Sequence, residues 1–459
     1  MGRILAILVP LIAIALYYYM NQEVKLPENY RYDHYWGDEE LDEDEKPPED
    51  NKQMTTFEIS VHDQMLTDYK ARIGRTKVTE SLKNTNCEYG INSNALKQIL
   101  LHWANDYDWR AHEKILNQYI HHQTEIEGLN IHFVRVPAKA GAKVIYPLML
   151  IHGWPSTFYE FYKVADILAT PVNGVAYEII IPSLPGYAWS DAPGLPGCNA
   201  IHVARIFSKI MTRLGYARFY LMGTDWGSVV GKAMSVLHPS RIAGFYTTLP
   251  WVHIGIKQLM TLAVGEFMPG FVYDEPLIDW VKVHPVSKTI SNILRETGYM
   301  HLQMTKPDTI GYALLDSPSG IAAYILEKYS TWTNAAYTSQ PDGGLIQPGI
   351  AKFTMDELCT NLMIYWTTRT IATSMRFYKE NVEVMHLVAK LKVSKEVPVA
   401  IGSTPSDLYD IYPKALLVHS YANISHYTNF PRGGHFMAFE EPKLLADDMR
   451  AFFAKTKFL

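Results

Sequence analysis

The stretch FYLMGTDWGSVV, residues 219–230, decides the fold class of this sequence. It is an apolar run that continues into Gly223-Thr224-Asp225-Trp226-Gly227 and then into the start of an apolar helical pattern. A nucleophile elbow has this form, because a strand there turns sharply into a helix and the strained backbone leaves room only for small flanking residues. Asp225 stands where such elbows carry serine, so the predicted nucleophile is a carboxylate.

The segments on either side of the elbow alternate between strands and helices. ARIFSKIMTRLG is typical of an amphipathic helix, and buried strands are predicted in VIYPLMLIHGWP, YEIIIPSLPGYAWSD, RFYLMGTD and VPVAIGS (397–403). Continuous apolar strands that alternate with helices indicate a parallel sheet covered on both faces. We therefore predict an α/β fold, the α/β-hydrolase fold, with ligands beyond the carboxyl ends of its strands.

The rest of the chain is predicted to surround this core, which comprises residues 141–250 and 381–459. Between residues 251 and 380 the strand signal fades and helical patterns rich in aromatic residues and methionine replace it. This helical insertion is predicted to be a lid over the site, although a structural helical subdomain would have the same pattern. Residues 53–140 have mixed helix and strand patterns and are predicted to wrap around the core.

The N-terminus begins with MGRILAILVPLIAIALYYYM. The apolar run from Ile4 to Met20 is long enough to cross a hydrocarbon core, and the tyrosines that end it suit a membrane interface. A cleaved signal peptide is the alternative, but cleavage after Ala13-Ile14-Ala15 would leave those tyrosines on a soluble N-terminus. We expect a membrane anchor at residues 1–21, followed by an extended acidic tether at 22–52.

Composition excludes several function classes. Apolar residues make up 48% of the 459 and charged residues 19%, as in a folded protein with a large core. The net charge is -5, but DEELDEDEKPPED (38–50) alone carries -8, so the remainder is near neutral at +3. No basic cluster suggests nucleic acid, and the acidic stretch is interpreted as a solvated tether rather than a docking motif. The three cysteines and 17 histidines lack the spacing of disulfide frameworks or metal sites.

A carboxylate nucleophile in this fold needs a histidine base and an acid that orients it, in the chain order nucleophile, acid, histidine. The predicted base is His435 in PRGGHFMAFEEP, and the predicted acid is Asp407 in GSTPSDLYD. Asp410 is the rival acid, but Asp407 lies nearer the end of the strand. The backbone amides of Trp226 and of Trp154 in HGWP are the predicted oxyanion donors, although HGWP could also be a plain turn.

A carboxylate is already ionised at neutral pH and forms an ester when it attacks an alkyl carbon. Asp225 therefore suits substrates with a leaving group on saturated carbon, such as an epoxide or an alkyl halide. The histidine then activates water to cleave the ester. An opening epoxide also needs a hydroxyl donor from the lid, whereas a halide does not.

Several long motifs resemble the microsomal epoxide hydrolase family, which includes the insect juvenile hormone epoxide hydrolases. They span the chain and include HGWPSTFYEFY, PSLPGYAWS, FYLMGTDWGS, RETGYMHLQMTKPDTIGYAL, LEKYSTWTN, MRFYKEN and GGHFMAFEEP. The resemblance implies Asp225 as nucleophile and His435 as base. It also implies that two lid tyrosines act as proton donors, Tyr299 from RETGYMH and Tyr378 from MRFYKEN. Two positions depart from the family pattern: Asp407 stands where vertebrate members carry glutamate, and Thr224 where relatives often have glycine.

The resemblance further implies an enzyme of the endoplasmic reticulum membrane that needs no metal or organic cofactor and hydrolyses lipophilic epoxides to vicinal diols. Juvenile hormone, fatty-acid epoxides and xenobiotic epoxides are all candidate substrates. A haloalkane dehalogenase would share the nucleophile, and a catalytically inactive lipophile carrier would share the fold, although its triad should be broken. The sequence leaves open the physiological substrate, the membrane side of the catalytic domain and the oligomeric state.

Overall fold

The computed structural model describes residues 24–39, 47–273, 291–292, 294–407, 413–456 and 458. The predicted anchor, part of the predicted tether and the rival acid Asp410 lie outside these residues. Within them, no helix combines the length and the apolar character needed to cross a membrane.

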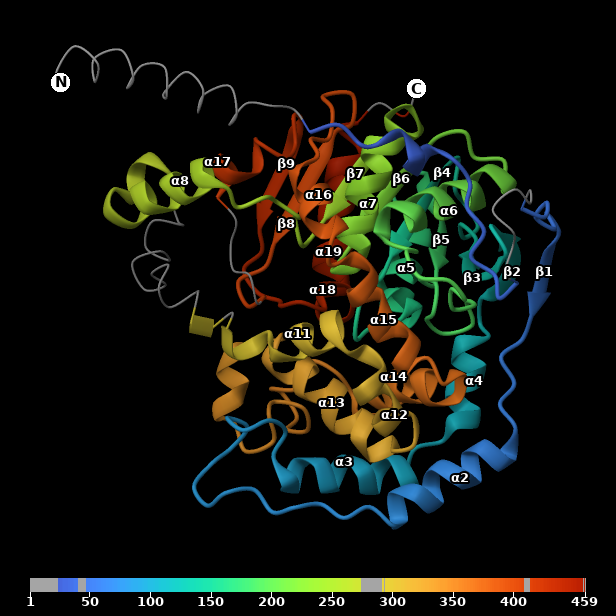
Figure 1. Ribbon diagram of the computed structural model, residues 1–459, viewed down its shortest axis with the longest axis vertical. Coiled ribbons are helices and arrows are strands. Elements are labelled where there is room, and N and C mark those ends of the chain that lie inside the picture. Colours follow the sequence, from blue (N-terminus) through green and yellow to red (C-terminus); the bar gives the residue numbers. More distant parts are fainter. Residues whose placement is uncertain are drawn as a thin grey trace.

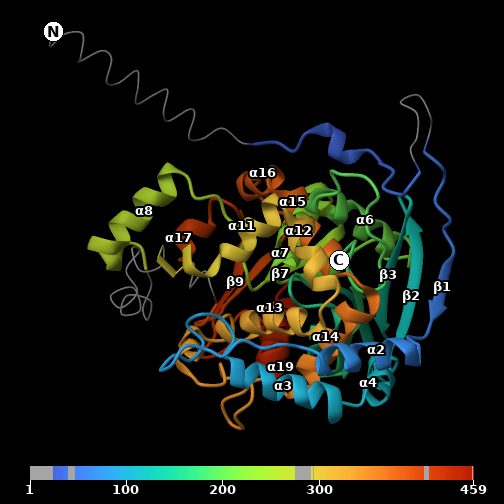
Figure 2. The ribbon, with the colours of Figure 1, turned by 60° about the horizontal axis from the view of Figure 1, so that its bottom comes forward.

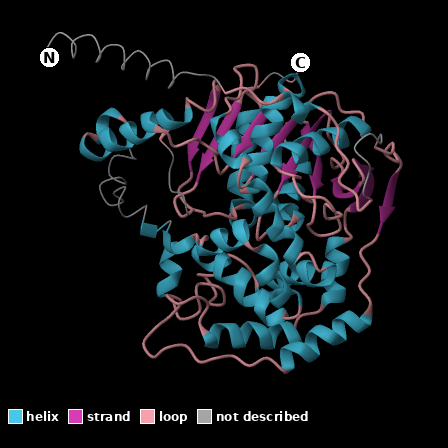
Figure 3. Cartoon of the chain, in the orientation of Figure 1, coloured by secondary structure: helices cyan, strands magenta, loops and turns pink. Residues whose placement is uncertain are grey.

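A nine-stranded sheet forms the centre of the described chain, in the order β1-β2-β3-β5-β4-β6-β7-β8-β9 (Figures 1 and 3). Strands β6, β7 and β8 are buried at every residue, so helices cover both faces of the sheet there. The strands are β1 (Met54–Phe57), β2 (Ile120–Ile126), β3 (Leu129–Val136), β4 (Val144–Ile151), β5 (Val175–Pro182), β6 (Phe219–Gly223), β7 (Ile242–Thr247), β8 (Val399–Ser403) and β9 (Ile424–Asn429).

Two groups of helices pack against this sheet, and a separate body of helices lies below it in Figure 1. One group consists of α5 (Tyr162–Ala169), α18 (Met437–Glu440) and α19 (Pro442–Phe453), and the other of α6 (Ala200–Arg213), α7 (Trp226–Leu237) and α16 (Val384–Lys390). The remaining helices are α2 (Asp63–Gly74), α3 (Ser93–Asn105), α4 (Trp109–Leu116), α8 (Ile256–Phe267), α11 (Gly298–Thr305), α12 (Pro307–Leu315), α13 (Pro318–Thr331), α14 (Met355–Thr368), α15 (Ile371–Asn381) and α17 (Lys414–Leu417), with the 3-10 turns η1 (Glu28–Arg31), η2 (Phe158–Phe161), η3 (Pro239–Arg241), η4 (Pro269–Phe271) and η5 (Ala335–Ser339).

The prediction of a parallel sheet, made for the core strands from residue 144 on, is confirmed for β4 to β9, and the three strands before them, for which no direction was predicted, pair differently. Every neighbouring pair from β5 to β9 is parallel, whereas β1, β2 and β3 pair antiparallel and join the edge at β5. These three strands come from the predicted wrapping segment. A short connection explains the β2–β3 pair: Glu127 and Gly128, both at positive φ, turn β2 directly into β3, and a tight turn of this kind joins antiparallel strands.

Between β1 and β2 the same segment leaves the sheet and contacts the helical body. Its helices α2, α3 and α4 pack on α13 and α14, as both ribbon views show (Figures 1 and 2). The described residues of the predicted lid contain helices and loops without a strand. The carboxyl ends of the central strands face this helical body, and the predicted site residues lie between the two.

Candidate active site

The elbow at Asp225 has the strained backbone expected of its motif. Asp225 lies between β6 and α7 with φ 48° and ψ -124°, a conformation that costs a non-glycine residue about 1–3 kcal/mol. Gly223 and Gly227 are required here, because a Cβ at Gly223 would collide with the Gly227 carbonyl and one at Gly227 with the Ile151 carbonyl. The turn therefore projects the Asp225 side chain beyond the sheet edge, and only glycine fits on either side of it.

Thr224, the departure within the elbow, does not disturb this arrangement. Its hydroxyl accepts a hydrogen bond from Thr248 at 3.1 Å, and its amide donates to the carbonyl of Ile151 at 3.2 Å. Neither bond involves the carboxylate of Asp225. The threonine ties the elbow to the loop after β7 and to the end of β4.

The HGWP turn contacts the nucleophile directly. The backbone N–H of Trp154 donates to Oδ1 of Asp225 at 2.8 Å, and its role as an oxyanion donor stays a prediction. Gly153 is needed for this approach, since a Cβ there would overlap the carboxylate. The amide of Trp226 is the first of α7, but its role as the second donor stays a prediction.

The predicted base and acid meet the nucleophile in a buried row. His435 is 4% exposed; its Nδ1 bonds Oδ1 of Asp407 at 2.9 Å, and its Nε2 lies 3.6 Å from Oδ2 of Asp225. Burial alone would lower the pKa of His435, but Asp407 and Asp225 outweigh it and raise the pKa well above its ordinary value. Three residues from three separate loops thus lie together in the predicted order.

Sequence reasoning missed a fourth residue, Glu440, that holds the histidine loop. Its two carboxyl oxygens accept the N–H of Gly434 at 2.8 Å and that of Phe436 at 2.9 Å, the two amides that flank His435. The amide of His435 itself donates to the carbonyl of Trp332 at 2.9 Å. The GGHFMAFEEP motif contains Glu440, but only the fold shows that the side chain turns back to the loop.

The two predicted lid tyrosines line the same small cavity as Asp225. The ring of Tyr299 stacks on Trp154 at 5.2 Å and 8°, and Tyr378 meets Tyr299 edge-on at 5.8 Å. Tyr378 also packs on Trp226 at 4.8 Å. Burial first, then Tyr299 and Asp225, raise the pKa of Tyr378 well above its ordinary value, so its hydroxyl remains protonated.

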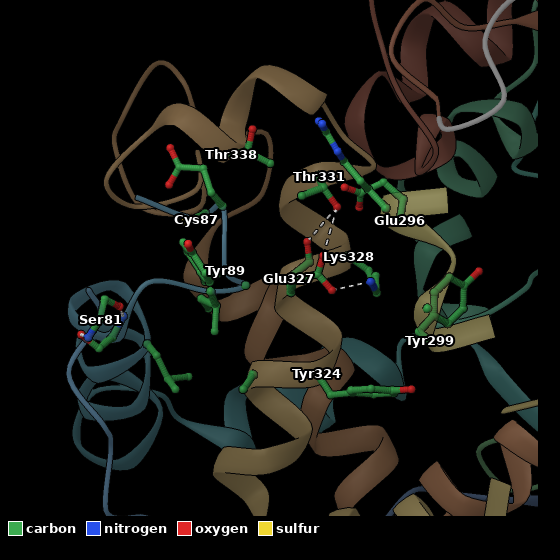
Figure 4. A pocket seen from close by; sticks show the side chains of 18 of the residues that line it. Ser81, Cys87, Tyr89, Glu296, Tyr299, Tyr324, Glu327, Lys328, Thr331 and Thr338 are labelled. Carbon is green, nitrogen blue, oxygen red and sulfur yellow. Dashed lines mark hydrogen bonds and ion pairs between the residues drawn. The ribbon is translucent and has the colours of Figure 1, made fainter. Parts of the chain in front are cut away.

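Two cavities adjoin these residues. A small one of about 30 Å³ is lined by Asp225, His435, Tyr299, Tyr378 and apolar side chains, among them Trp226, Val229, Leu249, Trp251, Met300 and Met385. A larger one of about 1610 Å³ lies between the wrapping segment and the lid helices and reaches Tyr299 and Asp407 (Figure 4). Within the described residues, no group of three or more His, Cys, Asp or Glu side chains is arranged to hold a metal ion.

Comparison with known proteins identifies the family. The chain matches the model "Epoxide hydrolase N terminus" over residues 54–161 and the model of the α/β hydrolase fold over residues 146–285. It is 42% identical to epoxide hydrolase 1 of Sus scrofa over 411 residues, which are 88% of this chain and 89% of that protein. The chain belongs to the epoxide hydrolase family.

Other epoxide hydrolases resemble the chain over nearly its whole length. It is 38% identical to juvenile hormone epoxide hydrolase 1 of Ctenocephalides felis, over 96% of this chain and 93% of that one. The crystal structure of juvenile hormone epoxide hydrolase from Bombyx mori superposes with a TM-score of 0.84 at 38% identity, covering 92% of this chain and 98% of that one. These matches confirm the predicted family and the α/β-hydrolase fold.

Proposed function

We propose that this epoxide hydrolase converts lipophilic epoxides to vicinal diols through a covalent ester on Asp225. The observation that supports it most is that Asp225 lies beside the His435–Asp407 pair and lines one cavity together with Tyr299 and Tyr378. The pair can activate water and the tyrosines can protonate a leaving oxygen. An intact row of this kind favours an enzyme over an inactive lipophile carrier.

In the first step a carboxylate oxygen of Asp225 attacks a ring carbon of the epoxide. The ring C–O bond breaks, its electron pair moves to the epoxide oxygen, and a lid tyrosine donates its proton there. The products are a hydroxyalkyl ester and a tyrosinate. The hydrogen bond from Trp154 restrains Oδ1, which fixes the orientation of the attacking carboxylate.

In the second step His435 takes a proton from water, and the hydroxide attacks the ester carbonyl carbon. The amides of Trp154 and Trp226 are the proposed donors to the resulting oxyanion. Collapse releases the diol, and the two protons of the water return to the alkoxide and to the tyrosinate. The charges fit this order, because esterification removes the negative charge of Asp225 that helps to keep His435 protonated. Once the ester is present, His435 therefore gives up this proton to solvent more readily, and its neutral form can then take a proton from water.

The cavity walls support a lipophilic substrate. The small cavity is about the size of one water molecule, so a substrate must displace side chains. Met300 and Met385 line it, and methionine adapts readily to different shapes. The larger cavity, which reaches Tyr299 and Asp407, offers room for the remainder of a long molecule. Juvenile hormone, fatty-acid epoxides and xenobiotic epoxides all meet these requirements, and the names of the relatives make juvenile hormone the first to assay.

We further propose that residues 1–21 anchor the enzyme in the endoplasmic reticulum membrane. The apolar run from Ile4 to Met20 supports this, and it lies outside the described residues. Alkaline extraction of membranes from cells that express the full chain tests it. An anchored chain stays in the pellet, and a chain found entirely in the wash contradicts the anchor.

The ester mechanism is tested with His435→Gln. This variant should consume one equivalent of epoxide and gain the substrate mass in intact-mass spectra, because alkylation needs no base but ester hydrolysis does. In a single wild-type turnover in heavy-oxygen water, the label should enter Asp225 before it enters the diol. Sustained turnover by His435→Gln without added mass contradicts the proposal. Halide release from chloroalkanes would instead support the dehalogenase alternative.

A further inference from the structure

The two lid tyrosines have different electrostatic surroundings. The ammonium of Lys328, on α13, lies 4.8 Å from the ring centroid of Tyr299 and 5.6 Å from that of Trp332. Lys328 is only 6% exposed, so water screens its charge weakly. Among the described residues, no cation lies over the ring of Tyr378, which packs instead on Trp154, Trp226 and Tyr299.

Lys328 has acidic neighbours that must be considered. It forms an ion pair with Glu327, and in Figure 4 its ammonium lies between the Glu327 carboxylate and Tyr299. Glu296, in the helical residues just before α11, is the other nearby acid; burial first and then Glu327 raise the pKa of its carboxyl, while Lys328 and Arg295 oppose that rise. The ammonium of Lys328 is therefore the charge that lies against the Tyr299 ring. Its ion-pair partner Glu327 lies on the other side of the ammonium from that ring.

This difference matters when the epoxide oxygen leaves. A tyrosine that gives up its proton becomes a phenolate, and a nearby positive charge stabilises that anion. A phenolate at Tyr378 would instead form in a fully buried position where, among the described residues, no cation lies over the ring, an arrangement that disfavours negative charge. The two hydroxyls are thus not equivalent donors.

We propose that Lys328 makes Tyr299 the proton donor of the pair, by holding a positive charge against the ring on which the phenolate forms. Tyr378 then remains protonated and donates a hydrogen bond to the same oxygen. Lys328 touches neither substrate nor Asp225, so it is a positioning residue that acts through Tyr299. This inference rests on the proposed ester mechanism.

The experiment compares Lys328→Met with Lys328→Arg in the full chain. Stopped-flow tryptophan fluorescence follows the two half-reactions in single turnovers, since Trp154 and Trp226 adjoin Asp225. Lys328→Met should slow ester formation about tenfold, a typical effect of a buried cation on a ring, and leave ester hydrolysis within twofold of wild type. Lys328→Arg should restore most of the rate. The double variant Glu327→Gln/Lys328→Met, which leaves no unpaired carboxylate, should behave like Lys328→Met, and Lys443→Met on the surface is the matched control.

Coupling to the tyrosines separates an electrostatic role from a structural one. In a Tyr299→Phe background, Lys328→Met should have no further effect on ester formation, while in a Tyr378→Phe background its full effect should remain. Equal slowing of both half-reactions, or an undiminished effect without the Tyr299 hydroxyl, overturns the inference. Asp225→Ala separates failure of the Lys328 proposal from failure of the ester mechanism. Turnover by Asp225→Ala refutes the ester mechanism. Ester formation at the wild-type rate in Lys328→Met refutes only the role of Lys328.

Discussion

On the sheet side of the site, backbone hydrogen bonds hold the reacting groups, whereas on the lid side ring contacts hold them. The Asp225 carboxylate accepts the amide of Trp154, and amides of the His435 loop bond Glu440 and the Trp332 carbonyl. Tyr299 and Tyr378 are positioned mainly against the rings of Trp154 and Trp226. Backbone bonds fix directions closely, while stacked rings can slide. The side that forms covalent bonds is thus the more rigid one, and the side that must admit substrate is the more adaptable.

The sheet side, with His435 and Asp407, is expected to control ester hydrolysis, and the lid side, with the two tyrosines, is expected to control ester formation. Asp407→Asn tests the sheet side and has the largest expected effect. Asparagine cannot stabilise a positive imidazole, so ester hydrolysis should fall by roughly 10³–10⁴-fold, as when the orienting acid of a serine protease is amidated. Ester formation should stay within about twofold, because it needs no base. Stopped-flow fluorescence resolves both phases in single turnovers.

Asp407→Glu is the control for this variant. A glutamate keeps the negative charge and should retain much of the hydrolysis rate, with a loss that reflects its extra methylene. If Asp407→Asn slowed ester formation as much as ester hydrolysis, the division of work between the two sides would be wrong.

The lid side is tested by the double variant Tyr299→Phe/Tyr378→Phe. Without a proton donor for the leaving oxygen, ester formation from an epoxide should fall by roughly 10²–10⁴-fold. A bromohydrin that yields the same ester should be less affected, since bromide leaves without a proton. Rapid-quench mass spectrometry measures both rates, and Tyr312→Phe on the exposed surface of α12 serves as the control. Equal losses with both substrates would mean that the tyrosines shape the site rather than protonate the oxygen.

How far the sequence predicts each side follows from the same difference. Asp225, His435 and the Trp154 amide lie in short motifs whose glycines reveal the backbone geometry, so local reasoning identifies them. Tyr299 and Tyr378 are two among 30 tyrosines, and only the family resemblance singles them out. Ring contacts between distant helices leave no pattern in a short stretch of sequence, so the two lid tyrosines could not be identified from local motifs alone.

Other features depend on contacts that no short segment contains. Lys328 reads as an ordinary charged residue of a helical pattern until α11 brings the ring of Tyr299 against it. The antiparallel strands β1 to β3 join the sheet through an edge pairing between β3 and β5 that the wrapping segment alone does not specify. Asp407 is intermediate, because its place after a strand predicts its position, while its bond to His435 appears only in the fold.

Glu440→Gln tests whether the backbone bonds of the His435 loop matter for the sheet side. The amide group of glutamine can accept one of the two N–H groups but not both, and leaving a buried donor unpaired costs about 1–3 kcal/mol. Ester hydrolysis should slow about tenfold as His435 loses its fixed orientation, with ester formation less affected. The neighbour Glu441→Gln, which pairs with the Lys352 and Arg432 side chains and accepts neither of the two amides that flank His435, should leave both phases near wild type. Indistinguishable kinetics for the two variants would remove Glu440 from the site.

The smallest expected effect concerns stability and a second buried acid on the sheet side. Glu160 lies in η2, just after the HGWP turn, and burial raises the pKa of its carboxyl to about 8, with Ser156 opposing that rise. The folded chain thus keeps a proton that the unfolded chain loses near pH 4.5. Between pH 4.5 and 8 the folded chain binds one more proton at this carboxyl than the unfolded chain does. The free energy of unfolding therefore falls as the pH rises through this range, by up to about 1.4 kcal/mol for each unit of pKa difference.

Glu160→Gln removes this dependence, because glutamine is neutral throughout that range. Thermal unfolding at pH 5 and pH 8 should therefore show a smaller loss of Tm for the variant than for the wild type, whatever the absolute difference between the two proteins at pH 5. Glu440, whose pKa burial also raises to about 8, contributes a similar slope that remains in the variant, so the slope should shrink without vanishing. Parallel Tm curves would show that Glu160 is ionised in the folded chain, and a rigid sheet side would then carry an additional buried negative charge beside His435 and Asp225.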